Sequence, residues 1–138
     1  MPAMHGFRTH NYATMGLAAV LLLIGPTVGR AAVAWITSPS GNLACEMADR
    51  YAGSTSVPCQ SFNKPHTVTM GLSGRLKICR GELCLSNAPA NTVTLAYNTS
   101  RTVGRFRSTS LRASIRCIVT ATRPAFLINR DGITRVRP

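Results

Sequence analysis

Acidic residues are scarce in this sequence. Only four Asp and Glu stand against 16 Lys and Arg in 138 residues, so the formal net charge is +12 at pH 7. Glycoside hydrolysis uses a pair of carboxylates that flank the scissile bond, and the sequence shows no such pair. We therefore predict no catalytic residues of this kind and no cofactor. The four acids are Glu46, Asp49, Glu82 and Asp131.

Histidine is equally scarce, because His66 is the only one after residue 34. A serine hydrolase would need this imidazole beside a serine such as Ser38 or Ser40 and a carboxylate that orients it. The sequence contains no G-x-S-x-G motif. We therefore predict a non-enzymatic binding or interaction role and keep a small extracytoplasmic hydrolase as the alternative.

No apolar run is long enough to cross a membrane as a helix. Residues 15–25 form a run of 11 apolar residues, whereas a spanning helix needs about 20. A polar segment with Arg8 precedes the run, Pro26 ends it, and Ala32-Val33-Ala34 follows as an A-x-A pattern. This order is typical of a secretory signal peptide. We predict a signal peptide over residues 1–34 and a secreted β-rich domain over residues 35–138; an envelope-anchored structural protein that retains residues 1–34 is a further alternative.

Sustained helical periodicity is also missing after residue 34. Short β-branched runs alternate with Gly, Pro, Asn and Ser, which favours an all-β fold: a small antiparallel sheet, sandwich or barrel. We expect turns at "LSG" (72–74) and "DG" (131–132), and loops over 48–64 and 86–91. The expected strands are 42–47, 66–72, 75–79, 92–97, 102–108, 113–121, 124–128 and 133–136.

The string "SPSGNLAC" (38–45) allows three interpretations. A lipid-modified cysteine needs an aliphatic residue three positions before it, but Asn42 stands there. A reactive serine lacks the partners described above. Pro39 presets φ for a turn, and Gly41 tolerates positive φ. We therefore expect a turn that leads into a strand carrying Cys45.

Five cysteines lie beyond residue 44, a density that indicates an oxidising compartment when an export signal is present. Cys79 and Cys84 could form half of a zinc site, but structural zinc usually has two such pairs or added histidines. We therefore predict no metal site and expect disulfides instead. The cysteines are Cys45, Cys59, Cys79, Cys84 and Cys117.

Arginine dominates the C-terminal part of the chain. From residue 101 onward there are nine arginines and one acid. If they share a face, it would attract an anionic polymer, a lipid headgroup or an acidic protein surface, with Phe106 as a possible stacking element. The alternative is a basic surface without a specific partner. The candidate face comprises Arg101, Arg105, Arg107, Arg112, Arg116, Arg123, Arg130, Arg135 and Arg137.

Several of these strings together resemble a family of small secreted bacterial proteins, mainly actinobacterial, that is catalogued as a domain of unknown function. Members of the family typically begin the mature domain with an aromatic residue, two variable residues and then the motif Ser-Pro-Ser-Gly-Asn-aliphatic-small-Cys, which this chain resembles. The strings that carry the resemblance are "WITSPSGNLAC" (35–45), "VPCQS" (57–61), "CRGE" (79–82), "LAY" (95–97), "GRF" (104–106), "SIRC" (114–117) and "AFLINRDGITRV" (125–136). The resemblance implies an exported β-rich fold and no particular activity.

The chain departs from the family's usual six cysteines, so the family's pairing does not transfer intact. One expected cysteine is missing between Cys59 and Cys79, and another position holds Ser108. With the family's pairing not transferable, we expect Cys45 to pair with Cys59 and Cys79 with Cys84. Cys117 is then free or available for an intermolecular bridge. A Cys84–Cys117 pair is the rival.

Overall fold

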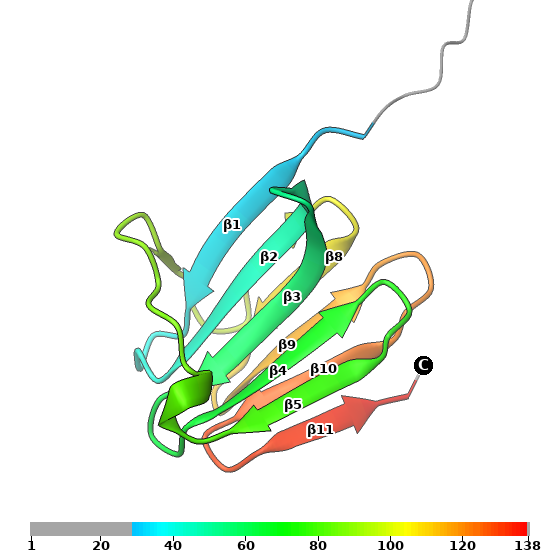
Figure 1. Ribbon diagram of the computed structural model, residues 1–138. Coiled ribbons are helices and arrows are strands. Elements are labelled where there is room, and N and C mark those ends of the chain that lie inside the picture. Colours follow the sequence, from blue (N-terminus) through cyan, green and yellow to red (C-terminus); the bar gives the residue numbers. More distant parts are fainter. Residues whose placement is uncertain (1–28, 138) are drawn as a thin grey trace, which may run out of the picture.

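The computed structural model describes residues 29–137 of the chain. The predicted signal peptide therefore lies almost entirely outside the described residues. Within residues 29–137 no helix is long and apolar enough to span a membrane. The fold is all-β: two sheets face one another, as Figure 1 shows.

The first sheet has the strand order β5-β4-β3-β2-β1-β6. Its strands pair antiparallel with their neighbours, except that the two-residue β6 runs parallel to β1 at the edge. A single 3₁₀ turn, η1 (Glu82–Cys84), follows β5. The strands are β1 (Ala32–Thr37), β2 (Leu43–Tyr51), β3 (Ser54–Ser61), β4 (His66–Gly71), β5 (Leu76–Arg80) and β6 (Val93–Thr94).

The second sheet is wholly antiparallel, in the order β11-β10-β9-β8-β7. Neighbours in the sheet are also neighbours in sequence, so this half of the chain is a simple meander of hairpins. Its strands are β7 (Ser100–Val103), β8 (Phe106–Ser110), β9 (Ser114–Val119), β10 (Ala125–Asn129) and β11 (Ile133–Val136).

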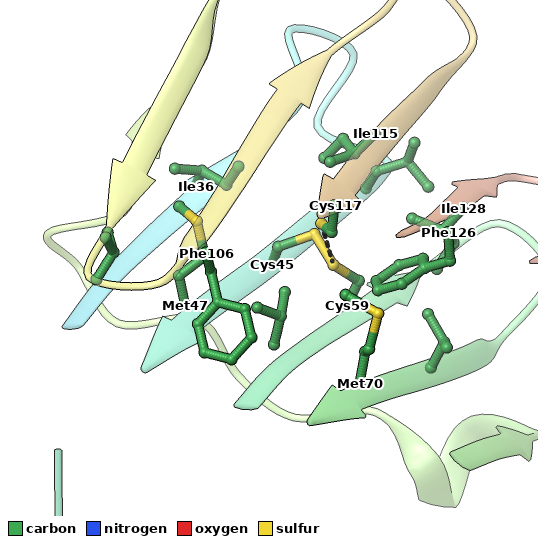
Figure 2. Packing of buried hydrophobic residues seen from close by; sticks show 14 of the residues in the cluster. Ile36, Cys45, Met47, Cys59, Met70, Phe106, Ile115, Cys117, Phe126 and Ile128 are labelled. Carbon is green, nitrogen blue, oxygen red and sulfur yellow. Dashed lines mark hydrogen bonds between the residues drawn. A yellow bond between two sulfur atoms is a disulfide. The ribbon is translucent and has the colours of Figure 1, made fainter. Parts of the chain in front are cut away.

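The core lies between the two sheets and takes side chains from both (Figure 2). On β9 the buried residues Ile115, Cys117 and Val119 alternate with the exposed Arg116. This is the expected period of a strand with one face buried. The largest fully buried side chains are Phe106, Phe126, Ile36, Met47, Met70, Ile115 and Ile128. Phe106 has no exposed surface, so the expectation that it could stack on a ligand is wrong.

Three expectations about secondary structure are also wrong: one loop and two strands. Residues 48–64 are not a loop, because β2 continues to Tyr51 and β3 fills residues 54–61. The two strands meet in a tight turn where Ala52 has φ 47° and Gly53 has φ 75°. Positive φ at an alanine is uncommon, so this turn carries no strong sequence signature. The polar composition of β3 hid a strand whose Val57 and Cys59 face the core.

The other two errors concern residues 102–108 and 92–97. The first string is a hairpin, not one strand, because Gly104 adopts φ 52° and reverses the chain between β7 and β8. In the second, only Val93 and Thr94 are paired, and only Leu95 is buried. By contrast, the predicted turns after β4 and β10 are confirmed, with Met70 opposite Leu76 and Ile128 opposite Ile133.

The predicted cleavage point after Ala34 lies inside β1. Ala32 pairs with Asp49, Val33 with Ala48 and Ala34 with Met47. Ala32 and Ala34 also pack against the core. A domain that begins at Trp35 would therefore lack half of this strand.

Candidate functional site

The nine C-terminal arginines do not form one continuous face. Alternation along β8 and β9 places Arg107 and Arg116 on the outer face of the second sheet, because their neighbours Phe106, Ser108, Ile115 and Cys117 point into the core. Thr109 lies opposite Arg116 in the register, so Arg107 and Arg116 are diagonal neighbours on one face.

Arg123 joins these two from the turn between β9 and β10. It adopts φ 70°, and its backbone N–H donates to the carbonyl of Val119 at 2.8 Å. The three arginines line an open hollow of about 200 Å³. We call this the arginine hollow; it is lined by Ser100, Arg107, Thr109, Arg116, Ile118, Thr120 and Arg123.

Residues with hydroxyl groups, Ser100, Thr109 and Thr120, line the hollow together with the arginines. The Oγ of Ser100 and the Oγ1 of Thr109 are 2.7 Å apart, and Arg107 Nε donates to Thr102 Oγ1 at 3.3 Å. Hydroxyls and guanidinium groups both donate hydrogen bonds to oxyanions. Sequence reasoning missed Ser100, Thr109 and Thr120, although strand alternation from Arg107 would have placed Thr109 on the same face.

The arginine hollow has no carboxylate partner. Among residues 29–137, ion pairs within 4.0 Å use only Lys64, Arg105 and Arg130 as cations. The remaining two acids, Glu46 and Glu82, belong to the first sheet and its 3₁₀ turn. Like charges on one face of a sheet repel one another, so three neighbouring cations without an anion are a favourable place for one to bind.

Arg105, in contrast, is already paired. Asp49 of β2 accepts from the Arg105 backbone N at 2.8 Å, from Nε at 3.1 Å and from Nη2 at 2.6 Å. Hydrogen bonds from this arginine side chain are the main reason that the pKa of Asp49 lies below its usual value, and they outweigh the opposing effect of burial. The pair ties the β7–β8 turn to the first sheet and leaves Arg105 unsuitable as a free anion site.

The other arginines are dispersed. Arg135 Nη1 donates to the carbonyl of Gly74 at 2.9 Å, which joins β11 to the β4–β5 turn. Arg101 is exposed on the edge strand β7, and Arg137 follows β11. Arg112 and Arg130 lie at one end of the sandwich, where Arg130 faces Asp131 at 3.7 Å.

The string "SPSGN" forms the expected turn at that same end. Gly41 has φ 74°, its N–H donates to the carbonyl of Ser38 at 2.9 Å, and Leu43 then begins β2. Ser38 Oγ accepts from the Leu43 N–H at 3.1 Å and contacts Ser40 Oγ at 3.0 Å. The turn borders an open groove of about 430 Å³ together with Arg112 and Arg130. Its serines therefore serve the turn itself.

His66 is buried and structural. Its Nδ1 contacts the carbonyl oxygen of Lys64 at 2.5 Å, and its Nε2 contacts that of Asn129 at 3.1 Å. Because Asn129 belongs to the second sheet, the imidazole links the two sheets. Both ring nitrogens face backbone carbonyls, and no serine of the described residues hydrogen-bonds to either one. In the described residues His66 therefore contacts backbone carbonyls and is not hydrogen-bonded to Ser38 or Ser40.

The structure contains the disulfides Cys45–Cys59 and Cys79–Cys84 and leaves Cys117 as a free, buried thiol. Full burial means that Cys117 cannot reach a second chain from the folded state. Cys45, Cys59 and Cys117 are the one group of the described part of the chain whose ligand atoms come close enough for a metal ion. Two of these sulfurs are bonded to each other, so the oxidised cluster offers a single thiol.

Comparison with known proteins returns no matching family model, no matching curated protein and no matching solved structure. Membership of the secreted actinobacterial family therefore stays a prediction that depends on the strings quoted above. Two disulfides in an all-β domain are compatible with an extracytoplasmic location.

Proposed function

We propose that this protein is exported and acts as a binding domain whose arginine hollow holds an anionic polymer. The observation that carries the proposal is the convergence of Arg107, Arg116 and Arg123 on one hollow without any carboxylate to neutralise them. Planar guanidinium groups bind phosphate or sulfate oxygens through paired hydrogen bonds. A hollow of about 200 Å³ suits one such group of a longer chain.

An anionic polymer fits this surface better than a lipid bilayer. Proteins that lie on membranes combine basic residues with apolar side chains that enter the lipid. None of the exposed large apolar residues of the described chain lines the arginine hollow. They lie elsewhere: Tyr51, Phe62, Ile78, Leu83, Val93 and Tyr97.

The test compares two triple variants that remove the same charge. One carries Arg107→Gln, Arg116→Gln and Arg123→Gln; the control carries Arg75→Gln, Lys77→Gln and Arg80→Gln on or beside β5 of the first sheet. Binding of fluorescently labelled linear polyphosphate is followed by anisotropy over a range of salt concentrations. The hollow variant should lose about 100-fold or more in affinity, as three charge-assisted contacts imply. Its affinity should also depend less on salt.

The control variant should change affinity by less than about threefold, because its charges lie on the other sheet. An equal loss in both variants would show that binding follows total charge and would contradict the proposed site. Vesicles with anionic headgroups serve as a second probe. Tighter binding to these vesicles than to polyphosphate would also contradict the proposal.

A further inference from the structure

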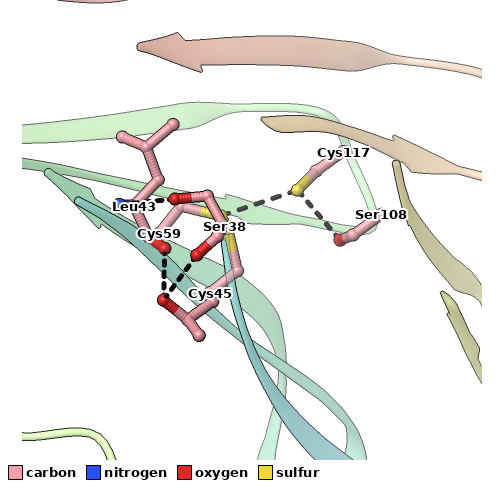
Figure 3. Close-up of a disulfide and its surroundings, with 7 residues drawn as sticks. Ser38, Leu43, Cys45, Cys59, Ser108 and Cys117 are labelled. Carbon is pink, nitrogen blue, oxygen red and sulfur yellow. Dashed lines mark hydrogen bonds between the residues drawn. A yellow bond between two sulfur atoms is a disulfide. The ribbon is translucent and has the colours of Figure 1, made fainter. Parts of the chain in front are cut away.

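Three sulfur atoms meet at the centre of the core. Cys45 and Cys59 lie directly opposite each other on β2 and β3 and form a disulfide within the first sheet. Cys117 comes from β9 of the second sheet, and its Sγ lies 3.5 Å from the Sγ of Cys59 (Figure 3). All three sulfurs fall within 4.8 Å of one another. A free thiol therefore contacts a disulfide across the interface between the sheets.

The surroundings of Cys117 isolate it from every other reactant. The side chain has no exposed surface, and its one further polar neighbour is Ser108, whose Oγ lies 3.0 Å from the sulfur. Burial raises the pKa of the Cys117 thiol to about 12, and the contact with Ser108 opposes this only in part. Reagents in water cannot reach the thiol in the folded state, whereas the Cys45–Cys59 disulfide touches it.

We propose that Cys117 exchanges with this disulfide, so that the protein has a second covalent form in which Cys59–Cys117 joins the two sheets. The sulfur of deprotonated Cys117 attacks Sγ of Cys59, the Cys45–Cys59 bond breaks, and Cys45 leaves as a thiolate. Cys45 then takes up the proton that Cys117 released. One disulfide replaces another, so the step consumes no oxidant and no reductant.

The geometry makes this exchange slow in the native state. Attack on a disulfide requires the three sulfurs to be close to a line, but their mutual distances form a triangle. The sulfur of Cys117 must therefore swing about the Cα–Cβ bond in a closely packed core. The scarcity of its thiolate slows the step further. We expect exchange to accelerate at high pH and near the melting temperature, where the core opens.

The two forms differ in what they hold together. Cys45–Cys59 spans 14 residues of sequence between neighbouring strands, whereas Cys59 and Cys117 are 58 residues apart and belong to opposite sheets. The second form would resist separation of the sheets, because its disulfide joins them covalently. It would also stabilise the fold more, because a longer closed loop restricts the unfolded chain more. This inference is independent of the anionic partner proposed above.

The first test removes one sulfur. In Cys45→Ala the remaining thiols of Cys59 and Cys117 are neighbours in the fold but are buried, so the unfolded variant is refolded in the presence of oxidised and reduced glutathione, which should join them. Each cysteine falls on its own tryptic peptide, so mass mapping without reduction identifies every pair. Finding Cys59 and Cys117 both unpaired, or Cys59 joined to glutathione, would overturn the proposal. The cleavages that separate the cysteines follow Arg50, Arg75, Lys77, Arg80, Arg101 and Arg116.

The second test uses the unmodified sequence, so it does not depend on the folding of a variant. The oxidised protein is incubated without redox reagents at neutral and at high pH, close to its melting temperature, and then quenched in acid and mapped. Cys59–Cys117 and a free Cys45 should accumulate, several-fold faster at high pH. Cys117→Ser, which cannot exchange, serves as the control. Exclusive recovery of Cys45–Cys59 under all conditions would show that no exchange takes place.

Discussion

The two sheets of this sandwich differ in their covalent links and in the charge that they carry. The first sheet with its 3₁₀ turn carries both disulfides and three of the four acids, whereas the second, with its turns and the end of the chain, carries nine arginines, one acid and no disulfide. A domain of this size has a modest core, so covalent links are a common supplement. The first sheet is therefore held by covalent bonds, and the second can expose uncompensated charge because its inner face packs on that sheet.

Contacts at both ends connect the two sheets. At one end Asp49 accepts three hydrogen bonds from Arg105 in the β7–β8 turn. At the other, His66 contacts the carbonyl of Asn129, and Lys64 pairs with Asp131 at 2.7 Å. The last pair is exposed and contributes little to stability. The comparison thus predicts that stability depends on the links within the first sheet and on Asp49 much more than on the surface charges of the second.

The largest effect should follow loss of the core disulfide. The double variant Cys45→Ala and Cys59→Ala should lower the free energy of unfolding by about 3–5 kcal/mol, since it loses loop closure and also leaves a small cavity. The matched variant Cys79→Ala and Cys84→Ala should lose about 2 kcal/mol or less, because its loop is shorter and its cysteines are more exposed. Chemical denaturation of each variant measures the difference. Equal losses in the free energy of unfolding would show that the buried Cys45–Cys59 disulfide stabilises the fold no more than Cys79–Cys84 does.

The Asp49 link should have an intermediate effect that depends on pH. The carboxylate of Asp49 is stabilised in the folded state and its pKa is lowered, so its contribution is complete above the unfolded pKa of about 4 and is lost as the pH falls below it. Asp49→Asn should destabilise the protein by about 1–2 kcal/mol at pH 7. It should also make stability less dependent on pH between about 5 and 2.

Glu82→Gln is the control for Asp49→Asn, because Glu82 is exposed and forms no ion pair among the described residues. It should leave the pH dependence of the unfolding midpoint as it is in the parent protein. If stability became less dependent on pH to the same extent in both variants, the effect would follow from net charge and not from the Asp49–Arg105 contact.

The smallest effect concerns the start of β1. A chain that begins at Trp35 loses the pairing of Ala32, Val33 and Ala34 with β2, so it should be about 1 kcal/mol less stable than a chain that begins at residue 29. Thermal unfolding of the two forms measures the loss. Equal melting temperatures would show that the first half of β1 adds nothing to the fold.

Much of the second sheet was predictable from sequence, because its order is local. Its β-branched run at 113–121 predicted the strand that carries Cys117, and Asp131-Gly132 predicted the last hairpin. The first sheet was harder, since β3 is mostly Ser, Thr, Gln and Pro. Its Val57 and Cys59 become core residues only because β2 and β4 flank the strand and the second sheet covers it. Likewise, alternation alone does not reveal that Gly104 divides one apparent strand into two.

The sequence by itself determined the all-β class, the "SPSGN" turn and the excess of arginine, because these depend on composition and on neighbouring residues. Only the tertiary structure decided which arginines converge, since Arg123 reaches Arg107 and Arg116 through the return of the chain after β9. It alone also placed Cys117 against Cys59, 58 residues away. Such contacts depend on how two sheets pack, and no local pattern encodes that packing.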